Sequence, residues 1–314
     1  MKKALVVGIN DYSFAPLNGC VTDAKKMHKL LERNEDGTKN IDCKLLTSPT
    51  EKITKAVLSE AIEDLFKDPV DLAVFYFSGH GAVTNYGGFL VTQDAKKYSE
   101  GYSMRDLIEL ANGSKVKEVV LIIDCCYAGM LGEIPSQKDH VVLKEGVSIL
   151  SACSSNQTSM EKNGEGVFTS LITDALNGGG SDILGKITIA SVYAYVDQAL
   201  GAWDQRPLFK SHVSRLFPVR QCKPEIDIDI LRQLPIYFPD QDFEYPLDPS
   251  YEPDADPACP EHENIFSQLQ KCRASRLVVP IGEEHMYYAA MNNKSCKLTA
   301  LGKYYWKLAK DGRI

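Results

Sequence analysis

The sequence lacks three features that would each indicate a class of protein. No apolar run reaches the ~18 residues of a membrane span, so no membrane partner is expected. The nine cysteines are an odd number with no C-x-x-C spacing, which argues against both a disulfide framework and a zinc site. A net charge of −7 argues against nucleic acid as the main partner. These absences predict a soluble protein of the reducing cytoplasm without a bound metal.

The first residues resemble a signal peptide, but we do not expect them to act as one. Their apolar run breaks at Asn10 and Asp11, too early for a signal-peptide core of about seven or more residues. We interpret residues 4–9 as a buried strand. With 314 residues, 44% of them hydrophobic, the chain can bury a full core and has room for an α/β domain and a smaller module.

Two apolar runs end in residues that could carry chemistry. Residues 72–77 lead directly into a Ser-Gly-His-Gly turn, and residues 119–123 lead into Asp-Cys-Cys. Both runs are typical of fully buried parallel strands, and chemistry in such sheets is done at the carboxyl ends of the strands. The pattern therefore brings His80 to the same edge as Cys125 and Cys126. This is the arrangement of a cysteine nucleophile with a histidine base.

The remainder of the first two thirds alternates between strand and helix patterns. This alternation predicts an α/β fold with right-handed crossovers, a largely parallel sheet and helices on both faces. Residues 82–102 are rich in Gly and Tyr, with one short strand expected at 89–91. The other expected strands are 44–47, 147–152 and 207–213. One helix is expected after Asp23, and a second is expected to start near 48–50 and to continue over 56–66. Further helices are expected at 103–110, 167–172 and 189–200.

The His and Cys motifs resemble those of the caspase-like cysteine proteases, and most of all their metacaspase branch. His80 precedes Cys126 by 46 residues, close to the roughly 50 residues typical of caspases. The metacaspase nucleophile is the third residue of an Asp-x-Cys triplet, so the resemblance assigns it to Cys126, and Cys125 is expected in the core. It further implies a caspase-like sheet from about residue 4 to 218, a protein substrate, and an oxyanion hole of the backbone N–H groups of Gly81 and Cys126.

The resemblance also implies an acidic specificity pocket. Metacaspases build it from a Cys-x-x-Asp pair, the serine of the Ser-Gly-His-Gly turn and the aspartate two residues before the nucleophile. Here these are Cys20, Asp23, Ser78 and Asp124, which we call the acidic pocket. Two converging carboxylates favour a cationic guest, so cleavage after Arg or Lys is expected. The alternative is that Asp23 caps a helix and Asp124 is a loop residue.

Calcium activation is not expected, and no cofactor is predicted. Many metacaspases bind calcium through clustered aspartates between His and Cys. That segment here offers only Asp94, Glu100, Asp106 and Glu109, with no adjacent pair of acidic residues.

The composition changes after the region of resemblance, which predicts a protease domain at 1–222, a linker or strap at 223–261 and a C-terminal α+β module at 262–314. Residues 224–257 contain ten acidic residues and seven prolines, whereas 262–314 contains nine Lys/Arg against four Asp/Glu. Bacterial caspase-like proteins often serve in antiviral defence or cell suicide, so a sensor for a nucleotide-type second messenger or an upstream sensor protein is expected. The candidate ligand-binding residues of the module are His285, Tyr287, Tyr288, Lys303, Tyr304, Trp306 and Arg313, although a helix with an ordinary core face explains 304–308 equally well.

Two further expectations concern activity. The polar loop at 130–145 contains Lys138 and Lys144, which match the expected specificity and are candidate self-processing sites. The alternative to a gated protease is a caspase-fold scaffold that binds partners without cleaving them. Intact His80 and Cys126 favour the enzyme.

Overall fold

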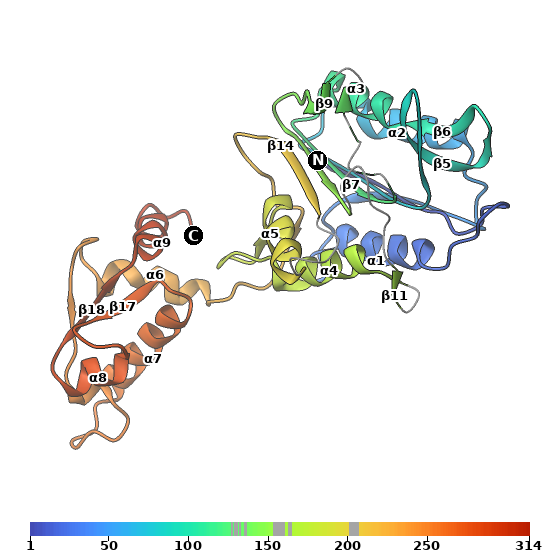
Figure 1. The fold of residues 1–314 in the computed structure, drawn as a ribbon. Coiled ribbons are helices and arrows are strands. Elements are labelled where there is room, and N and C mark those ends of the chain that lie inside the picture. The colour runs from blue at the N-terminus through green and yellow to red at the C-terminus, as the bar shows by residue number, and fades with distance from the viewer. Residues whose placement is uncertain are drawn as a thin grey trace. The chain divides into compact units, whose positions relative to one another are not determined.

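The chain forms two units, each with its own hydrophobic core (Figure 1). The computed structural model describes residues 1–126, 128, 131, 133–134, 137–152, 161–162, 165–200 and 207–314. The first unit comprises Met1–Ser181 and Gly185–Lys223, and the second comprises Asp182–Leu184 and Pro224–Ile314. Among the described helices, none has the length and apolar character needed to span a bilayer.

A six-stranded sheet lies at the centre of the first unit, in the order β14-β10-β7-β3-β1-β2. Neighbouring strands are parallel except β14, which runs antiparallel to β10. The predicted α/β class with a largely parallel sheet is therefore confirmed. The strands are β1 (Lys2–Gly8), β2 (Asp42–Thr47), β3 (Leu72–Ser78), β7 (Glu118–Asp124), β10 (Val147–Ser151) and β14 (Leu208–His212).

Helices cover both faces of this sheet (Figure 1). One face packs against α2 (Lys55–Lys67) and α3 (Met104–Gly113). The other packs against α1, α4 and α5. Every residue of β3 is buried because alternate side chains enter the two cores, which explains its unbroken apolar run. The second set is α1 (Cys20–Glu32), α4 (Val167–Asp174) with the π-helical turn η2 (Ala175–Gly179), and α5 (Ile189–Ala199).

Two local features differ from the sequence prediction. Helix α2 begins at Lys55 rather than near 48–50, because the Thr54 hydroxyl accepts a hydrogen bond from Val57 N at 3.3 Å and so caps the helix. Residues 81–103 form a three-stranded antiparallel sheet where only one short strand was predicted. Its strands are β4 (Gly81–Thr84), β5 (Gly87–Lys96) and β6 (Ser99–Ser103), and the remaining short strands of this unit are β8 (Glu133–Ile134), β9 (Gln137–Val141), β11 (Glu161–Lys162), β12 (Glu165–Gly166), β13 (Lys186–Ile187) and β15 (Arg220–Gln221).

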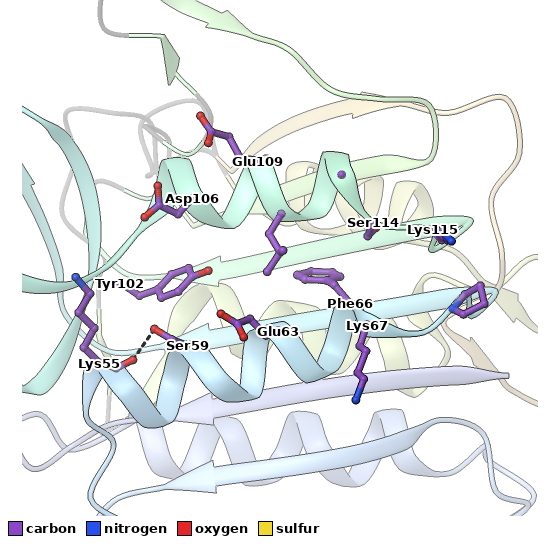
Figure 2. A pocket seen from close by; sticks show the side chains of 13 residues that line it. Lys55, Ser59, Glu63, Phe66, Lys67, Tyr102, Asp106, Glu109, Ser114 and Lys115 are labelled. Atoms are coloured by element: carbon purple, nitrogen blue, oxygen red, sulfur yellow. Dashed lines mark hydrogen bonds between the residues drawn. The ribbon is translucent and has the colours of Figure 1, made fainter.

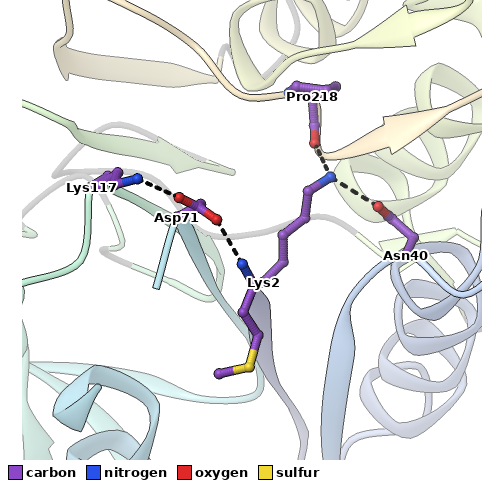
Figure 3. A network of polar contacts seen from close by, with 6 residues as sticks. Lys2, Asn40, Asp71, Lys117 and Pro218 are labelled. Atoms are coloured by element: carbon purple, nitrogen blue, oxygen red, sulfur yellow. Dashed lines mark hydrogen bonds and ion pairs between the residues drawn. The ribbon is translucent and has the colours of Figure 1, made fainter. Parts of the chain in front are cut away.

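The amino ends of the parallel strands meet at one edge of the sheet, which we call the amino edge. There, polar side chains join distant segments (Figure 3). Lys2 Nζ donates to Asn40 Oδ1 at 3.0 Å and to the Pro218 carbonyl at 2.8 Å. Lys117 Nζ lies 2.6 Å from Asp71 Oδ1, and this hydrogen bond lowers the pKa of the Asp71 carboxyl to about 2. The network ties the last segment of the first unit to β1.

Glu118 is a buried carboxylate at the same amino edge. Its residue is 1% exposed, and Oε2 accepts a hydrogen bond from Phe217 N. Within the described part of the chain, Oε1 has no hydrogen-bond partner. Burial raises the pKa of Glu118 to about 7, and burial also lowers the pKa of the nearby Lys2. This end of the sheet therefore holds a carboxyl group that favours its neutral form.

The second unit includes residues 224–261, which corrects their interpretation as a linker or strap. Their apolar side chains, including Leu231, Leu234 and Phe238, belong to the same core as those of the C-terminal helices. Composition misled because these few apolar residues, spaced along one helix face, suffice to anchor an acidic segment. The elements are α6 (Ile228–Tyr237), β16 (Tyr245–Pro246), the 3-10 helix η3 (Pro249–Tyr251), α7 (Pro260–Ala274), β17 (Val278–Ile281), α8 (Met286–Met291), β18 (Ser295–Leu298) and α9 (Ala300–Lys310).

Candidate active site

The carboxyl ends of β3 and β7 place His80 and Cys126 at one edge of the sheet, which we call the carboxyl edge. Ser78 and Asp124, the last residues of these strands, are paired in the parallel register, and Gly79 N donates to the Asp124 carbonyl at 3.4 Å. The Cys125 side chain is 1% exposed and belongs to the core, whereas Cys126 is partly exposed. Of the two cysteines, Cys126 is thus the one that is partly open to solvent.

The imidazole of His80 is oriented by groups near the end of β1. Its Nε2 lies 2.7 Å from the Ala15 carbonyl oxygen. Because a carbonyl can only accept, this contact requires a proton on Nε2, and the neutral ring then carries its lone pair on Nδ1. The rings of Tyr12 and Phe14 lie 4.6 and 5.8 Å from the imidazole. The arrangement selects the tautomer whose Nδ1 can take up a proton.

Tyr12 also holds the backbone of the histidine turn. Its hydroxyl accepts a hydrogen bond from His80 N at 3.1 Å and donates one to the Val91 carbonyl at 3.1 Å. The residue is 2% exposed, and burial raises the pKa of the phenol far above its ordinary value, so it stays a neutral donor. Sequence reasoning missed Tyr12 and Ala15, because an irregular segment and a backbone carbonyl carry no residue signature.

Gly81 touches the backbone of the cysteine turn. A Cβ atom at Gly81 would lie only 2.0 Å from the Cys126 carbonyl oxygen, so no other residue fits here without a shift. Val91 N donates to the His80 carbonyl, which makes Gly81 and Leu90 a pair without mutual hydrogen bonds in the antiparallel ladder. The Gly81 N–H therefore points away from β5.

Asp23 and Asp124 approach each other around Gly166, at the start of α4. Asp23 Oδ2 accepts from Gly166 N at 3.1 Å, and Asp124 Oδ2 accepts from Thr169 Oγ1 at 2.7 Å. A Cβ atom at Gly166 would lie 2.7 Å from Asp124 Oδ2 and 3.1 Å from Asp23 Oδ2. Both aspartates are nearly fully buried. Two carboxylates from α1 and β7 thus converge on Gly166, where a larger residue would have to displace the Asp124 carboxylate.

The other two residues of the acidic pocket lie beside these carboxylates. Ser78 is buried and pairs with Asp124, and Cys20 begins α1 one turn before Asp23. Tyr76 lies beneath them, with its hydroxyl 2.7 Å from Thr169 Oγ1. Burial, followed by the charges of Asp124 and Asp23, raises the pKa of Tyr76 well above its ordinary value. All four residues assigned to the pocket come together, joined by Tyr76, Gly166 and Thr169.

A separate groove lies between α2 and α3 (Figure 2). Its volume is about 830 Å³, and Phe66 and Tyr102 form part of its lining. Glu63, Asp106 and other charged side chains surround it (Figure 2). Neither the His80–Cys126 pair nor any residue of the acidic pocket lines this groove, so it is distinct from the candidate catalytic centre.

The candidate ligand-binding residues of the second unit have different environments. Trp306 is 6% exposed, and its Nε1 donates to the Phe238 carbonyl at 2.6 Å, so it is a core residue and cannot stack on a ligand. This corrects its assignment. Lys303 pairs with Asp242 at 2.5 Å. The Tyr287, Tyr288, Tyr304 and Arg313 side chains are exposed, and His285 precedes α8 with its ring 6.2 Å from that of Tyr288.

Some sequence predictions fall outside the described residues. They concern residues 130, 132 and 135–136, which belong to the polar loop expected at 130–145. In the described ranges, no group of three or more His, Cys, Asp or Glu side chains is placed to hold a metal ion.

With this geometry established, comparisons with known proteins identify the family. The family model described as "Caspase domain" matches residues 1–218, and the chain belongs to this family. The resemblance seen in the sequence is therefore confirmed. The fold is also similar to that of caspase-1 from Spodoptera frugiperda, with a TM-score of 0.52 and 14% identity over 70% of this chain and 90% of that one.

The curated relatives are metacaspases. The chain is 43% identical over 90 residues to Metacaspase-1 of Meyerozyma guilliermondii, which is 26% of this chain and 22% of the relative. It is 29% identical over 158 residues to Metacaspase-4 of Arabidopsis thaliana, which is 45% of this chain and 36% of the relative. The chain thus matches well under half the length of these relatives.

Proposed function

We propose that this protein is a cysteine endopeptidase that uses Cys126 and His80 to cleave proteins after Arg or Lys. The observation that carries the proposal is the convergence of Asp23 and Asp124 on Gly166, at the edge where the His and Cys turns meet. A buried pair of carboxylates favours a guest that brings positive charge and several N–H donors. Membership of the caspase-domain family supports the same chemistry.

Each group has a role in the proposed reaction. His80 Nδ1 takes the proton of the Cys126 thiol, and the thiolate attacks the carbonyl carbon of the peptide bond. The Ala15 carbonyl holds the resulting imidazolium through Nε2–H. The oxyanion accepts hydrogen bonds from Gly81 N and Cys126 N, at a site worth about 3 kcal/mol per donor in related chemistry. His80 then protonates the leaving amine, and water hydrolyses the acyl-enzyme.

Gating by the second unit is part of the proposal. The aromatic group formed by His285, Tyr287 and Tyr288 is the surface of that unit that best supports binding of a nucleotide-type activator, because its tyrosines are exposed and adjacent. An effector of antiviral defence in the cytoplasm is the role we propose for a protease controlled in this way.

A panel of four fluorogenic peptides tests the proposal. The peptides differ only in the residue before the cut, which is Arg, Lys, Asp or Asn, and each is offered to the wild type and to Cys126→Ala. Parallel reactions contain calcium, and others contain a small-molecule extract of the host cell. We expect cleavage of the Arg and Lys peptides by the wild type alone. Preferred cleavage after Asp would contradict the acidic pocket, and no cleavage under any condition would favour the non-proteolytic scaffold.

A further inference from the structure

A second charged site lies in the first unit, at the far end of the helices that build the acidic pocket. It is a groove of about 630 Å³ between α1 and the α4–η2 segment. Figure 1 shows α1 and α4 side by side beneath the sheet. Lys26 and Lys29 lie at helical spacing on the side of α1 that lines the groove, and Arg33, the residue that caps the carboxyl end of α1, lines it too. Arg220, at the start of β15, completes the lining.

The groove is basic although the chain is acidic. Among the residues that the structure describes, four cationic side chains line it against the two carboxylates of Glu35 and Asp174, whereas the whole chain has a net charge of −7. Glu35 accepts a hydrogen bond from Lys223 N at 2.7 Å, so one of its carboxylate oxygens is already engaged by the backbone. A local excess of positive charge on an acidic protein attracts anions to this place rather than to the surface in general.

Arg220 is the most informative residue of the groove. It is 7% exposed, and its guanidinium donates to the Arg33 carbonyl at 3.1 Å, the Leu176 carbonyl at 2.5 Å and Asn177 Oδ1 at 3.2 Å. All three acceptors are neutral, and in the described part of the chain Arg220 forms no ion pair. Neutral acceptors thus hold the guanidinium rigidly, and its charge is not paired with either carboxylate of the groove lining, which makes it a preorganised anion ligand.

We propose that this groove binds a phosphate-bearing small molecule. A diphosphate group matches several converging cations better than a single carboxylate does, because it carries more charge and more acceptor oxygens. The volume lies in the range of small-molecule sites, roughly 300–1,000 Å³. None of the described lining residues is aromatic, so they offer no side chain on which a base could stack, and recognition rests on the phosphates. The ligand bridges α1 and α4 and stabilises their packing.

Ligand binding to full-length Cys126→Ala protein tests this site independently of any peptidase activity. Titration calorimetry and thermal unfolding are carried out with pyrophosphate, ATP and adenosine at constant ionic strength without divalent metal. We expect pyrophosphate and ATP to bind and to raise Tm, and adenosine to do neither. Binding of ATP without pyrophosphate would point to a nucleotide as the source of the phosphates and still supports the site.

Matched charge reversals on α1 locate the binding. Lys29 and Lys25 are both exposed on this helix, but only Lys29 lines the groove. Lys29→Glu should weaken pyrophosphate binding by at least about tenfold, the loss of one charged hydrogen bond, while Lys25→Glu leaves it unchanged. Arg33→Gln provides a second variant with a milder change. Equal losses at Lys25 and Lys29, tight binding of adenosine, or no binding of either phosphate compound at millimolar concentration would overturn the proposal.

Discussion

The two ends of β7 each bury a carboxylate, and the protein treats them in opposite ways. At the carboxyl edge, Asp124 accepts from Thr169 and lies close to the second carboxylate of Asp23. At the amino edge, Glu118 accepts from Phe217 N, and burial raises its pKa to about 7. The carboxyl end of β7 thus brings two carboxylates close together, whereas burial at the amino end favours the neutral form of a single one. Burial alone therefore does not distinguish the two carboxylates, whereas convergence with other polar groups does.

The largest expected effect is at the carboxyl edge and follows from removing the proposed nucleophile. We expect Cys126→Ala to lower kcat/KM for an Arg peptide by at least about a thousandfold, because the acyl-enzyme can no longer form. Cys125→Ala, which trims a buried core side chain, should cost about 1–2 kcal/mol of stability and leave most of the activity. Steady-state kinetics with folded variants decide, and an inactive Cys125→Ala beside an active Cys126→Ala would reverse the assignment.

Isosteric changes to the two pocket carboxylates should affect specificity. Asp23→Asn and Asp124→Asn each leave a bound guanidinium with one charged partner, so kcat/KM for Arg and Lys peptides should fall by about a hundredfold. The amides keep an oxygen acceptor for Gly166 N and Thr169, which limits the damage to folding. The matched control is Glu118→Gln, the same chemical change at the opposite edge. If it lowers kcat/KM equally, the acidic pocket is not the cause.

Glu118→Gln should instead change stability in a pH-dependent way. The folded state holds the Glu118 proton up to about pH 7, whereas an unfolded glutamate loses it near its ordinary pKa of 4.5. Between these values the folded state binds more protons, so wild-type stability falls as pH rises, by about 3 kcal/mol in total, and is flat above. The amide that replaces the carboxyl group in this variant cannot ionise, and Lys2 keeps its acceptors Asn40 and Pro218.

Urea unfolding of the Cys126→Ala protein, with and without Glu118→Gln, measures this effect at several pH values. The two curves should coincide near pH 4.5 and diverge towards pH 8, where the protein carrying Glu118→Gln is the more stable. Parallel pH profiles would show that Glu118 does not titrate in this range.

Tyr12→Phe sharpens the account of how His80 is positioned. The change removes the acceptor of His80 N and the donor to the Val91 carbonyl but keeps the ring against the imidazole. We expect kcat to fall about tenfold, because the backbone of the histidine turn is no longer held in place. KM should be nearly unchanged, because the acidic pocket is not altered. A rise in KM with normal kcat would place Tyr12 in substrate binding instead.

The smallest effect concerns self-processing. Lys144 Nζ donates to the Ser114 carbonyl at 2.5 Å and the Val116 carbonyl at 3.3 Å, and burial lowers the pKa of the amine. These bonds must break before Lys144 enters the acidic pocket. Mass spectrometry of active protein over time should therefore show a fragment ending at Lys138 several-fold earlier than one ending at Lys144. The reverse order would mean that the Lys144 bonds are not retained in solution.

The sequence by itself determined the fold class and the composition of the site. Unbroken apolar runs predict parallel strands, and parallel strands bring their carboxyl ends to one edge, so the pattern alone places His80 beside Cys125 and Cys126. The choice of Cys126 and the assignment of Ser78 and Asp124 to a pocket followed from the family resemblance. The Cys-x-x-Asp pair entered through the family resemblance, because nothing in its own pattern distinguishes a pocket aspartate from a helix cap.

Only the tertiary structure decided how these groups are held. The Ala15 carbonyl and the Tyr12 hydroxyl contact His80 although they lie 65 and 68 residues before it in the chain. The basic groove depends on Arg220 reaching Arg33, 187 residues earlier. Local pattern cannot report such pairs, because the contact arises from how distant segments pack. For the same reason, the composition of the C-terminal segment led us to predict that Trp306 binds a ligand, whereas the packing shows that it belongs to the core.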